Sequence, residues 1–355
     1  MSAAGGERVV DAKKLEAYVA RIFEGGGVPA DEAARVADAL VGADARGMTS
    51  HGVMRVPMYM KKVRAKGFRA GTKGNVLHET AATMLLDGED GLGQVIGWRA
   101  MEEAIAKARS VGVGVVGVTR SNHFGEGAYY ALEAIRHDMI GILTTNGSAN
   151  TPPHGGRSMV AGNLPLTVGV PAKRELPILL DMAMCASSKG KIAYAAKKGE
   201  KIPAGWAVDA TGQSTVDPQK VLDGGWILPI GGYKGWGMIL ILDILSGVLT
   251  GGPMGPEVTD LFTGAAETPQ GLGHFVLALN IAAFMPVEQF KQRMDQRIRS
   301  IKDSERLPGV DEILMPGERE LRLERERRAQ GIPLSVAVLD QVAGVAKELG
   351  VAPGV

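Results

Sequence analysis

The chain has 355 residues, with 40 lysines and arginines against 39 aspartates and glutamates, so its overall charge attracts neither nucleic acid nor an anionic membrane. No nucleic-acid or membrane partner is therefore expected, and the length predicts two lobes because it exceeds what one hydrophobic core usually supports. The single cysteine, Cys185, and an N-terminal stretch without a signal-peptide core predict a cytoplasmic protein.

Helices are predicted to dominate residues 1–72. Apolar periodicity predicts helices over 9–24 and 29–46, and in the second we expect Asp31 to cap the start and Gly47 to mark the end. Residues 53–64 are expected to begin extended, because Pro57 disfavours helix at Val56, and then to become helical.

Residues 73–285 are predicted to form a sheet domain with helices on its faces, an α/β class. Strands are expected at 78–87, 111–119, 140–145, 166–170, 178–181 and 274–284, and helices at 92–109, 187–199 and 237–249. The last helix is the most apolar run and falls short of the roughly 20 residues that cross a bilayer, so we expect it to be buried. Residues 286–355 are predicted to be helical again, and the charged run 318–328 is typical of a solvated helix face.

Two glycine-rich stretches could bind a nucleotide. Residues 112–117 (GVGVVG) match GxGxxG, but a helix is predicted before them and a strand after, which reverses the order of a Rossmann loop and excludes it. Residues 87–97 have the right order but no acidic residue downstream, which favours a plain tight turn. Lys234, in GGYKGWG at the start of a predicted helix, predicts an anion site.

Two histidines stand out as candidate catalytic residues. His51 and His123 each lie among Ser, Asn and Gly at the end of a predicted element, where functional residues collect, and imidazole suits proton exchange near neutrality. Arg55 and Tyr59 follow His51 at steps of four, so helical winding would place the three on one face, and an arginine fork suits a carboxylate. His154, in a turn-like loop, is a further candidate for a ligand contact.

Other chemistries find little support in the sequence. No HExxH, HxH or CxxC spacing occurs, so we expect no metal, and no GxSxG elbow indicates a serine hydrolase.

Six motifs in order resemble the malate/L-lactate dehydrogenase-like family of NAD(P)-dependent oxidoreductases: SHGVMRVPMY, SNHFGEGAYY, LDMAMCASSKGKI, IPAGWAVDATG, GGYKGWGM and MPGERE. That family is distinct from the Rossmann-type lactate and malate dehydrogenases. It includes ureidoglycolate, sulfolactate and diketogulonate enzymes and reductases of cyclic imino acids. The resemblance covers about residues 10–350 and implies a non-Rossmann cofactor fold, a helical lobe built from both chain ends, and a homodimer whose interface helps to build the site.

The resemblance also implies roles for individual residues. His51 and His123 match the catalytic histidines, and Ser50, Arg55 and Tyr59 match substrate contacts. The implied cofactor contacts are Gly147, Ser148, Asp181, Met182, Ala183, Met184, Cys185, Ala186, Ser187, Lys234, Pro316, Gly317 and Glu318. Two departures from the family pattern weaken any choice of substrate: TNGSA replaces SNSSP at 145–149, which removes the usual serine contact or moves it to Ser148, and GNLP replaces GTNP at 162–165.

We therefore expect hydride transfer between NAD or NADP and a small 2-hydroxy or 2-oxo acid, with Arg55 pairing with the carboxylate and one of the two histidines exchanging the proton. Reduction of a cyclic imino acid is the alternative within the family. A non-catalytic nucleotide-binding member of the fold and, more weakly, a metal-dependent hydrolase are alternatives from other classes.

Overall fold

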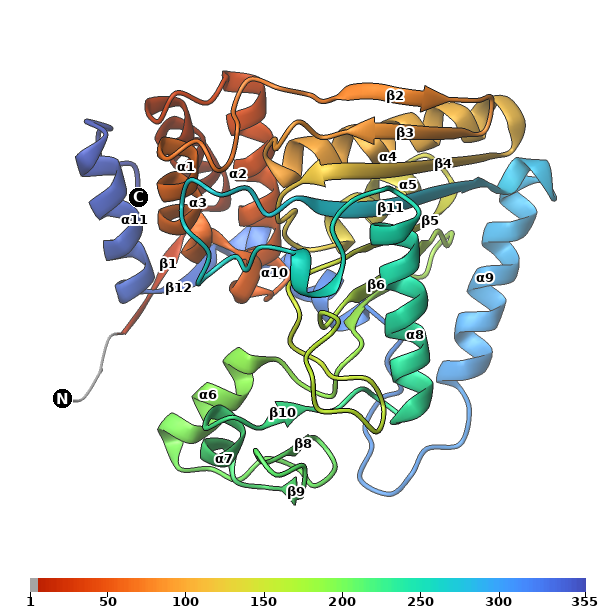
Figure 1. Ribbon diagram of the computed structural model, residues 1–355. Helices are drawn as coiled ribbons and strands as arrows, with labels where there is room; N and C mark the ends of the chain where they lie inside the picture. Colours follow the sequence, from red (N-terminus) through yellow and green to blue (C-terminus); the bar gives the residue numbers. More distant parts are fainter. Residues whose placement is uncertain (1–5) are drawn as a thin grey trace.

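A seven-stranded mixed sheet forms the centre of the computed structural model, which describes residues 6–355 (Figure 1). Its strand order is β2-β3-β4-β11-β5-β6-β7, and β3 and β4 form the one parallel pair among the described strands. The strands are β2 (Asn75–Glu79), β3 (Thr83–Asp87), β4 (Val113–Ser121), β5 (Met139–Thr145), β6 (Pro165–Val170), β7 (Ile178–Ala183) and β11 (Leu272–Asn280). This order differs from a doubly wound parallel sheet and confirms a non-Rossmann α/β fold.

Helices cover both faces of the sheet. On one face α4 (Gly93–Val111) and α5 (Ala128–Arg136) pack on a core that includes Val116, Leu143 and Val276. On the other face α8 (Tyr233–Asp243) and the π-helical segment Ile244–Val248 pack against β11, β4 and β5. A smaller lobe follows β7, with its own core and the elements α6 (Lys189–Lys198), β8 (Ala207–Val208), β9 (Ser214–Thr215), α7 (Pro218–Leu222) and β10 (Trp226–Ile227).

A helical lobe lies beside one end of the sheet and is built from both ends of the chain, as expected (Figure 1). Its core draws on residues 10–68 and 332–346, and β1 pairs antiparallel with β12 to join the two chain ends. Its elements are β1 (Glu7–Val10), α1 (Ala12–Gly25), α2 (Ala30–Ala45), α3 (Val56–Arg64), α10 (Glu318–Gln330), β12 (Ile332–Ser335) and α11 (Val336–Glu348). By contrast α9 (Val287–Lys302) lies against the sheet domain, where its Asp295 accepts the backbone N–H groups of residues 173–175.

Several local predictions were wrong for identifiable reasons. Residues 78–87 belong to a hairpin, β2 and β3, rather than to one strand. Val56 is helical, because Pro57 lies in the first turn of α3, where its missing N–H is not needed. Asp31 does not cap α2; it pairs with Lys73 at 2.6 Å, while Pro29 occupies the N-cap position. The short elements β1, α5 and β12 were not predicted.

The most apolar helix is only half buried, which corrects the prediction of a core helix. Ile239 and Leu242 of α8 face the core of the small lobe. Met238, Ile241 and Leu249 on and after α8 point outward and are 42%, 52% and 61% exposed. The segment therefore presents an apolar surface in the single chain.

Among residues 6–355, no helix combines the length and the apolar composition that a membrane crossing requires.

Candidate active site

His51 and His123 lie against each other at the junction of the helical lobe and the sheet. His51 ends a short 3₁₀ turn, Thr49–His51, that follows α2, and His123 is the second residue after the end of β4. Their ring centroids are 5.5 Å apart and the ring planes differ by 15°. Two segments far apart in the sequence thus bring their imidazole rings together.

Tyr59 and Gln94 fix the orientation of the His123 ring. The Tyr59 hydroxyl lies 2.6 Å from Nδ1 of His123, and Nε2 of Gln94 donates to the same hydroxyl oxygen at 3.2 Å. Because Gln94 is a donor there, Tyr59 gives its proton to Nδ1, and the His123 proton lies on Nε2. Burial raises the pKa of Tyr59 to about 12, so the phenol keeps its proton. The Tyr59 side chain is fully buried and lies against His123.

The backbone of the His123 loop is held as firmly as its ring. Oε1 of Gln270 accepts the His123 N–H at 2.9 Å, and the Gln270 N–H donates to Oδ1 of Asn122 at 2.9 Å. A side chain at Gly93 would collide with the carbonyls of Asn122 and His123, so the N-terminus of α4 packs directly on this loop. The strand–loop–helix at 87–97 is therefore filled by protein, which agrees with reading it as a structural turn.

Burial favours the neutral form of both histidines near pH 7. Burial, together with the charge of Arg55, lowers the pKa of His51 to about 4. Burial, with the nearby His51, Arg55 and His274, holds the pKa of His123 well below its ordinary value. Nδ1 of His51 lies 3.0 Å from the hydroxyl of Ser50, which is exposed. His51 thus has a polar contact toward solvent, whereas Nδ1 of His123 faces the interior.

Arg55 is the cation beside this pair. Its Nε donates to the Ser50 carbonyl at 2.6 Å, and its guanidinium carbon lies 4.9 Å from the centroid of the Phe262 ring. The side chain is half-buried, and these contacts leave its two terminal nitrogens with no partner among the described residues. A guanidinium group that is held through Nε and one aromatic ring can still bind a carboxylate with its two terminal nitrogens.

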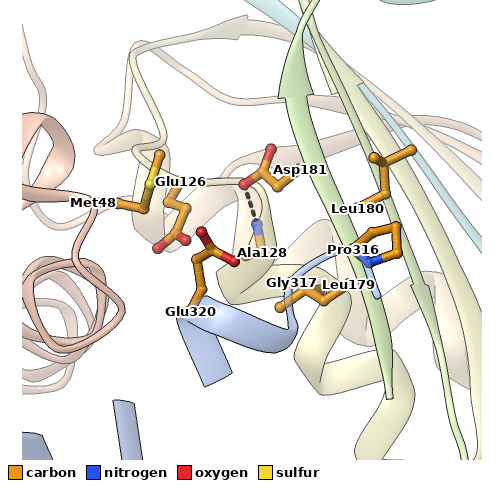
Figure 2. A pocket seen from close by; sticks show the side chains of 9 residues that line it. All are labelled: Met48, Glu126, Ala128, Leu179, Leu180, Asp181, Pro316, Gly317 and Glu320. Atoms are coloured by element: carbon orange, nitrogen blue, oxygen red, sulfur yellow. Dashed lines mark hydrogen bonds between the residues drawn. The ribbon is translucent and has the colours of Figure 1, made fainter. Parts of the chain in front are cut away.

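The structure also contains a cavity of about 210 Å³ (Figure 2). It is lined by Met48, Glu126, Ala128, Leu179, Leu180, Asp181, Pro316, Gly317 and Glu320. Asp181 accepts the Ala128 N–H at 2.8 Å and the Thr167 hydroxyl at 2.8 Å, and the Leu179 N–H donates to the Pro316 carbonyl at 2.9 Å. The fold therefore brings together Asp181, Pro316 and Gly317, which the sequence placed in separate motifs.

The other residues predicted to bind the cofactor are distributed along the exit from β7. Met184 and Cys185 are buried, and the Cys185 N–H donates to Oδ1 of Asn163 at 2.7 Å. Glu318 is engaged elsewhere: its carboxylate accepts the Met315 N–H at 2.9 Å and pairs with Lys302 at 2.5 Å. Met182 and Ala186 are half-buried and Ala183 is exposed.

Four further positions complete the set of residues predicted to bind the cofactor. Ser148 donates to Asp260 at 2.7 Å, and Gly147 has no heavy atom near the place of a Cβ. Lys234 is exposed at the N-terminus of α8. The buried hydroxyl of Ser187 has no partner among the described residues, so it is an unused polar group within the predicted cofactor stretch. The Ser187 hydroxyl and the Lys234 ammonium group are both suited to bind the phosphates of a nucleotide.

Three residues that organise the site were missed from the sequence: Gln94, Asn122 and Gln270. Asn122 stood within the SNHFGEGAYY motif, so its position beside His123 was a usable signal. Glutamines are common in loops and helices, and nothing local in the sequence singles out Gln94 or Gln270.

The malate/L-lactate dehydrogenase family model matches residues 10–343. The chain belongs to this family. Malate dehydrogenase of Pyrococcus abyssi is 39% identical over 345 residues, covering 95% of this chain and 94% of the relative. The structure of sulfolactate dehydrogenase from Methanocaldococcus jannaschii superimposes with a TM-score of 0.91 at 37% identity, covering 97% of this chain and 98% of the other.

The structure of delta1-piperideine-2-carboxylate reductase from Pseudomonas syringae pvar. tomato superimposes with a TM-score of 0.84 at 28% identity, covering 96% and 100% of the two chains. Relatives in the family are named as NAD(+)-dependent and as NADP(+)-dependent dehydrogenases. The protein is thus an NAD(P)-dependent oxidoreductase of the hydroxy-acid dehydrogenase type, which confirms the reaction class expected from the motifs.

Proposed function

We propose that the protein transfers a hydride between the nicotinamide of NAD(P) and C2 of a small 2-hydroxy or 2-oxo acid, with His51 and His123 at the reacting oxygen. The pairing of the two imidazoles beside a partly unpaired Arg55 carries this proposal. The bound nicotinamide supplies or accepts the hydride, and the residues of the chain bind the acid and handle its proton.

Arg55 pairs with the substrate carboxylate through its two terminal nitrogens and thereby orients C2. Holding a reactant in this way can supply several of the roughly 7–11 kcal/mol available from positioning. The carboxylate also offsets the positive charge that depresses the pKa of His51, so substrate binding raises that pKa toward the range where the ring can carry a proton.

His51 and His123 take different parts in this proposal. Tyr59 keeps the proton of His123 on Nε2, so this ring donates a hydrogen bond to the substrate oxygen and stabilises the charge that develops there. His51, with Ser50 and solvent beside it, exchanges the proton: its neutral ring accepts one from the hydroxy acid and its charged ring returns one to the oxo acid.

Reduction of a cyclic imino acid is a second candidate, supported by the similarity to the piperideine-2-carboxylate reductase structure. The same Arg55 contact would hold the carboxylate, and His51 would protonate the imine nitrogen in place of the oxygen. The carbon that receives the hydride stays next to the carboxylate in both reactions.

A substrate panel tests the proposal. Malate, lactate and sulfolactate with their oxo acids, and cyclic imino acids, would be incubated with each nicotinamide cofactor while NAD(P)H absorbance is followed. Turnover of oxo acids supports the first candidate, and turnover of the imines alone supports the second. Tight cofactor binding without turnover of any of them would contradict both and indicate a non-catalytic nucleotide-binding protein.

We also infer a cytoplasmic homodimer that joins through the apolar surface of α8 and the π-helical segment. Met238, Ile241 and Leu249 leave this surface uncovered in one chain, and a second copy is the partner that family resemblance implies. Light scattering after gel filtration should give twice the chain mass, and Ile241→Lys should give the monomer mass. A monomeric wild type would contradict the inference.

A further inference from the structure

A second cavity, of about 840 Å³, lies at the small lobe, and neither His51 nor His123 lines it. Two loops, 152–157 and 228–232, form much of its wall, and the remaining lining residues are Ala186, Gly205, Trp206, Val208, Gly212 and Trp226. Of the residues predicted to bind the cofactor, Ala186 alone lines it among those described.

This cavity begins where the predicted cofactor contacts end. Ala186 precedes Ser187, whose buried hydroxyl has no partner in residues 6–355, and the Ala186 N–H donates to the Leu228 carbonyl at 2.9 Å on the cavity wall. Gly231 and Gly232 line the cavity and lead directly into α8, at whose N-terminus Lys234 is exposed. A ligand that follows β7 outward from Asp181 would therefore enter this space.

The two cavities differ in charge. No aspartate or glutamate lines the larger one in the part of the chain that the structure describes, and Arg157 and His154 are its charged or titratable residues. The smaller cavity is lined by three carboxylates, those of Glu126, Asp181 and Glu320. In Rossmann-type sites an acidic residue bonds the ribose 2′-hydroxyl of NAD, whereas an arginine accommodates the 2′-phosphate of NADP, and the same charge complementarity applies to this different fold.

We propose that the larger cavity holds the adenosine end of the cofactor, that Arg157 pairs with a 2′-phosphate, and that the protein binds NADP(H) more tightly than NAD(H). Nη2 of Arg157 donates to the Ala210 carbonyl at 2.8 Å, which holds the guanidinium at the wall and leaves other N–H groups for the phosphate. Trp206 and Trp226 supply flat apolar walls for the adenine. The inference rests on the proposed function, and it goes further by choosing between the two nucleotides.

Calorimetric titration with 2′,5′-ADP and 5′-ADP tests the assignment without measuring turnover. The wild type should bind 2′,5′-ADP at least tenfold more tightly, and Arg157→Ala should remove most of that preference while leaving 5′-ADP affinity unchanged. Arg297→Ala, an exposed arginine on α9, is the matched control and should keep the preference. Equal affinities in the wild type, or a preference that survives in Arg157→Ala, would overturn the proposal and leave hydride transfer untouched.

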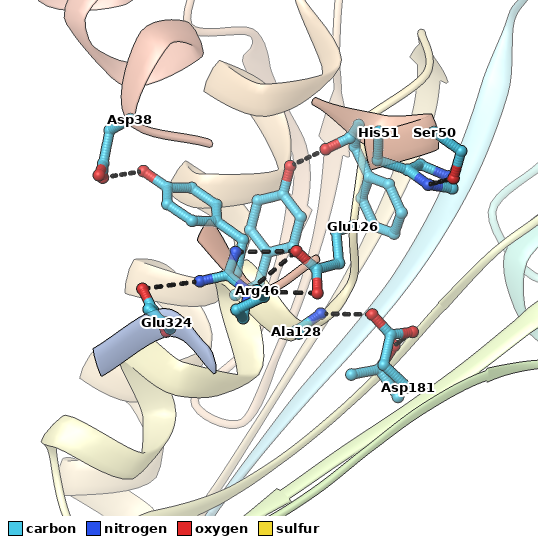
Figure 3. A network of polar contacts seen from close by, with 12 residues as sticks. Asp38, Arg46, Ser50, His51, Glu126, Ala128, Asp181 and Glu324 are labelled. Carbon is cyan, nitrogen blue, oxygen red and sulfur yellow. Dashed lines mark hydrogen bonds and ion pairs between the residues drawn. The ribbon is translucent and has the colours of Figure 1, made fainter. Parts of the chain in front are cut away.

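An independent observation concerns the C-terminal end of α2, which contacts both histidine loops. Oδ2 of Asp44 accepts the Val53 N–H at 2.7 Å, two residues after His51. Arg46 donates from Nε and Nη2 to the carboxylate of Glu126, three residues after His123, at 2.8–3.2 Å (Figure 3).

These contacts are buried and fit closely. The side chains of Arg46 and Glu126 are 2% and 4% exposed. A Cβ at Gly52 would collide with the Asp44 carboxylate, so the His51 loop lies tightly against it. From α10, Glu324 accepts from Nη1 of Arg46 at 3.2 Å, and Arg327 donates to the Asp44 carbonyl at 2.6 Å. The end of α2 is thereby fixed from the C-terminal part of the chain.

We infer that Asp44 and Arg46 are positioning residues that set the separation of the two imidazoles from a single helix end. A shift of either loop would move one ring relative to the other, and a misplacement of about 1 Å can cost on the order of 100-fold in rate.

Asp44→Ala and Asp44→Asn test this second inference against a matched control, Asp295→Ala. Asp295 is also buried and accepts backbone N–H groups, but it lies on α9 and holds residues 173–175. Asp44→Ala should lower kcat about 100-fold with unchanged 2′,5′-ADP affinity, and Asp44→Asn should restore most of it because its amide oxygen can still accept the Val53 N–H. Asp295→Ala should lower the melting temperature with little change in kcat.

Gly52→Ala provides a second route if Asp44→Ala does not fold, since the added methyl group displaces the same loop from the same carboxylate. It should reproduce the loss of kcat. The inference is overturned if Asp44→Ala loses no more turnover than Asp295→Ala, if Asn rescues no better than Ala, or if Gly52→Ala keeps wild-type kcat.

Discussion

The hydroxyl of Tyr59 lies 2.6 Å from Nδ1 of His123, so a residue from the helical lobe decides which nitrogen of a sheet-domain histidine carries the proton. Gln94 donates to the same hydroxyl, which makes Tyr59 the donor in its contact with His123. The two lobes thus meet in one hydrogen-bonded chain that ends at the His123 ring.

Tyr59→Phe should lower kcat roughly tenfold to 100-fold, because the ring loses the bond that selects its tautomer, and a buried hydrogen bond of this kind contributes about 1–3 kcal/mol. The KM for the acid should change little, since Arg55 is untouched. Tyr18→Phe, another buried tyrosine in the helical lobe, is the control and should leave both constants near wild type. An unchanged kcat in Tyr59→Phe would show that the contact does not orient the catalyst.

His51→Gln and His123→Gln should each lower kcat by roughly 10²–10⁴ while NADPH still binds. The pH dependence of kcat separates their roles: the limb due to the proton-exchanging group should disappear in His51→Gln and persist in His123→Gln. His137→Gln, a partly exposed histidine at the end of α5, is the control. Near-normal turnover in both variants would contradict the assignment of these histidines as catalytic residues. If the limb of the kcat–pH profile disappeared in His123→Gln alone, His123 and not His51 would be the proton-exchanging group.

Arg55→Lys should raise the KM for the acid at least tenfold with a smaller change in kcat, since an ammonium cannot make the two parallel bonds of a guanidinium fork. The lysine would also lose the Nε contact to the Ser50 carbonyl. Steady-state kinetics at saturating NADPH measure the change. Arg64→Lys, in an exposed pair with Glu348, should leave KM unaltered, and an unaltered KM in Arg55→Lys would exclude the carboxylate contact.

Much of the fold follows from local pattern. The boundary between α4 and β4 was predictable because Gly112, in the left-handed region at φ 94°, ends a helix with clear apolar periodicity and a β-branched run follows. The exposure of α8 could not be predicted, because apolar composition shows that a surface avoids water and does not show what covers it. The same limit hid the pairing of β1 with β12, which joins the two ends of the chain.

Candidate site residues that lie together in one sequence motif could be predicted, whereas those that depend on partners far along the chain could not. His51, Arg55 and Tyr59 come from one segment, and the structure does place them beside His123. The pairing of Arg46 with Glu126 was not predicted, since burial of an ion pair is decided by packing from elements far along the chain. No sequence spacing distinguishes such a pair from a solvated one.

His274 makes a final prediction, on the stability of the protein in acid. Its Nδ1 lies 2.8 Å from the Thr145 hydroxyl, its ring stacks on Phe124 with centroids 4.7 Å apart, and its Nε2 has no partner among the described residues. Burial lowers its pKa from 6.5 to about 3. In the unfolded chain the ring therefore takes up a proton below about pH 6.5, whereas the folded protein does not until about pH 3, so stability falls as the pH drops through this window.

The size of this loss of stability follows from the pKa shift of His274. At pH 5 the linkage amounts to about 2 kcal/mol relative to pH 7.5, because each pH unit below the unfolded pKa contributes about 1.4 kcal/mol. Urea unfolding at the two pH values should therefore show a smaller acid loss in His274→Gln than in wild type, by about that amount. His51 and His123 act in the same direction, and the raised pKa of Glu126 acts in the opposite one, but these contributions are common to both proteins and cancel in the comparison. His78→Gln, on the exposed edge strand β2, is the matched control, and an equal acid loss in His274→Gln and wild type would show that His274 is already protonated in the folded protein.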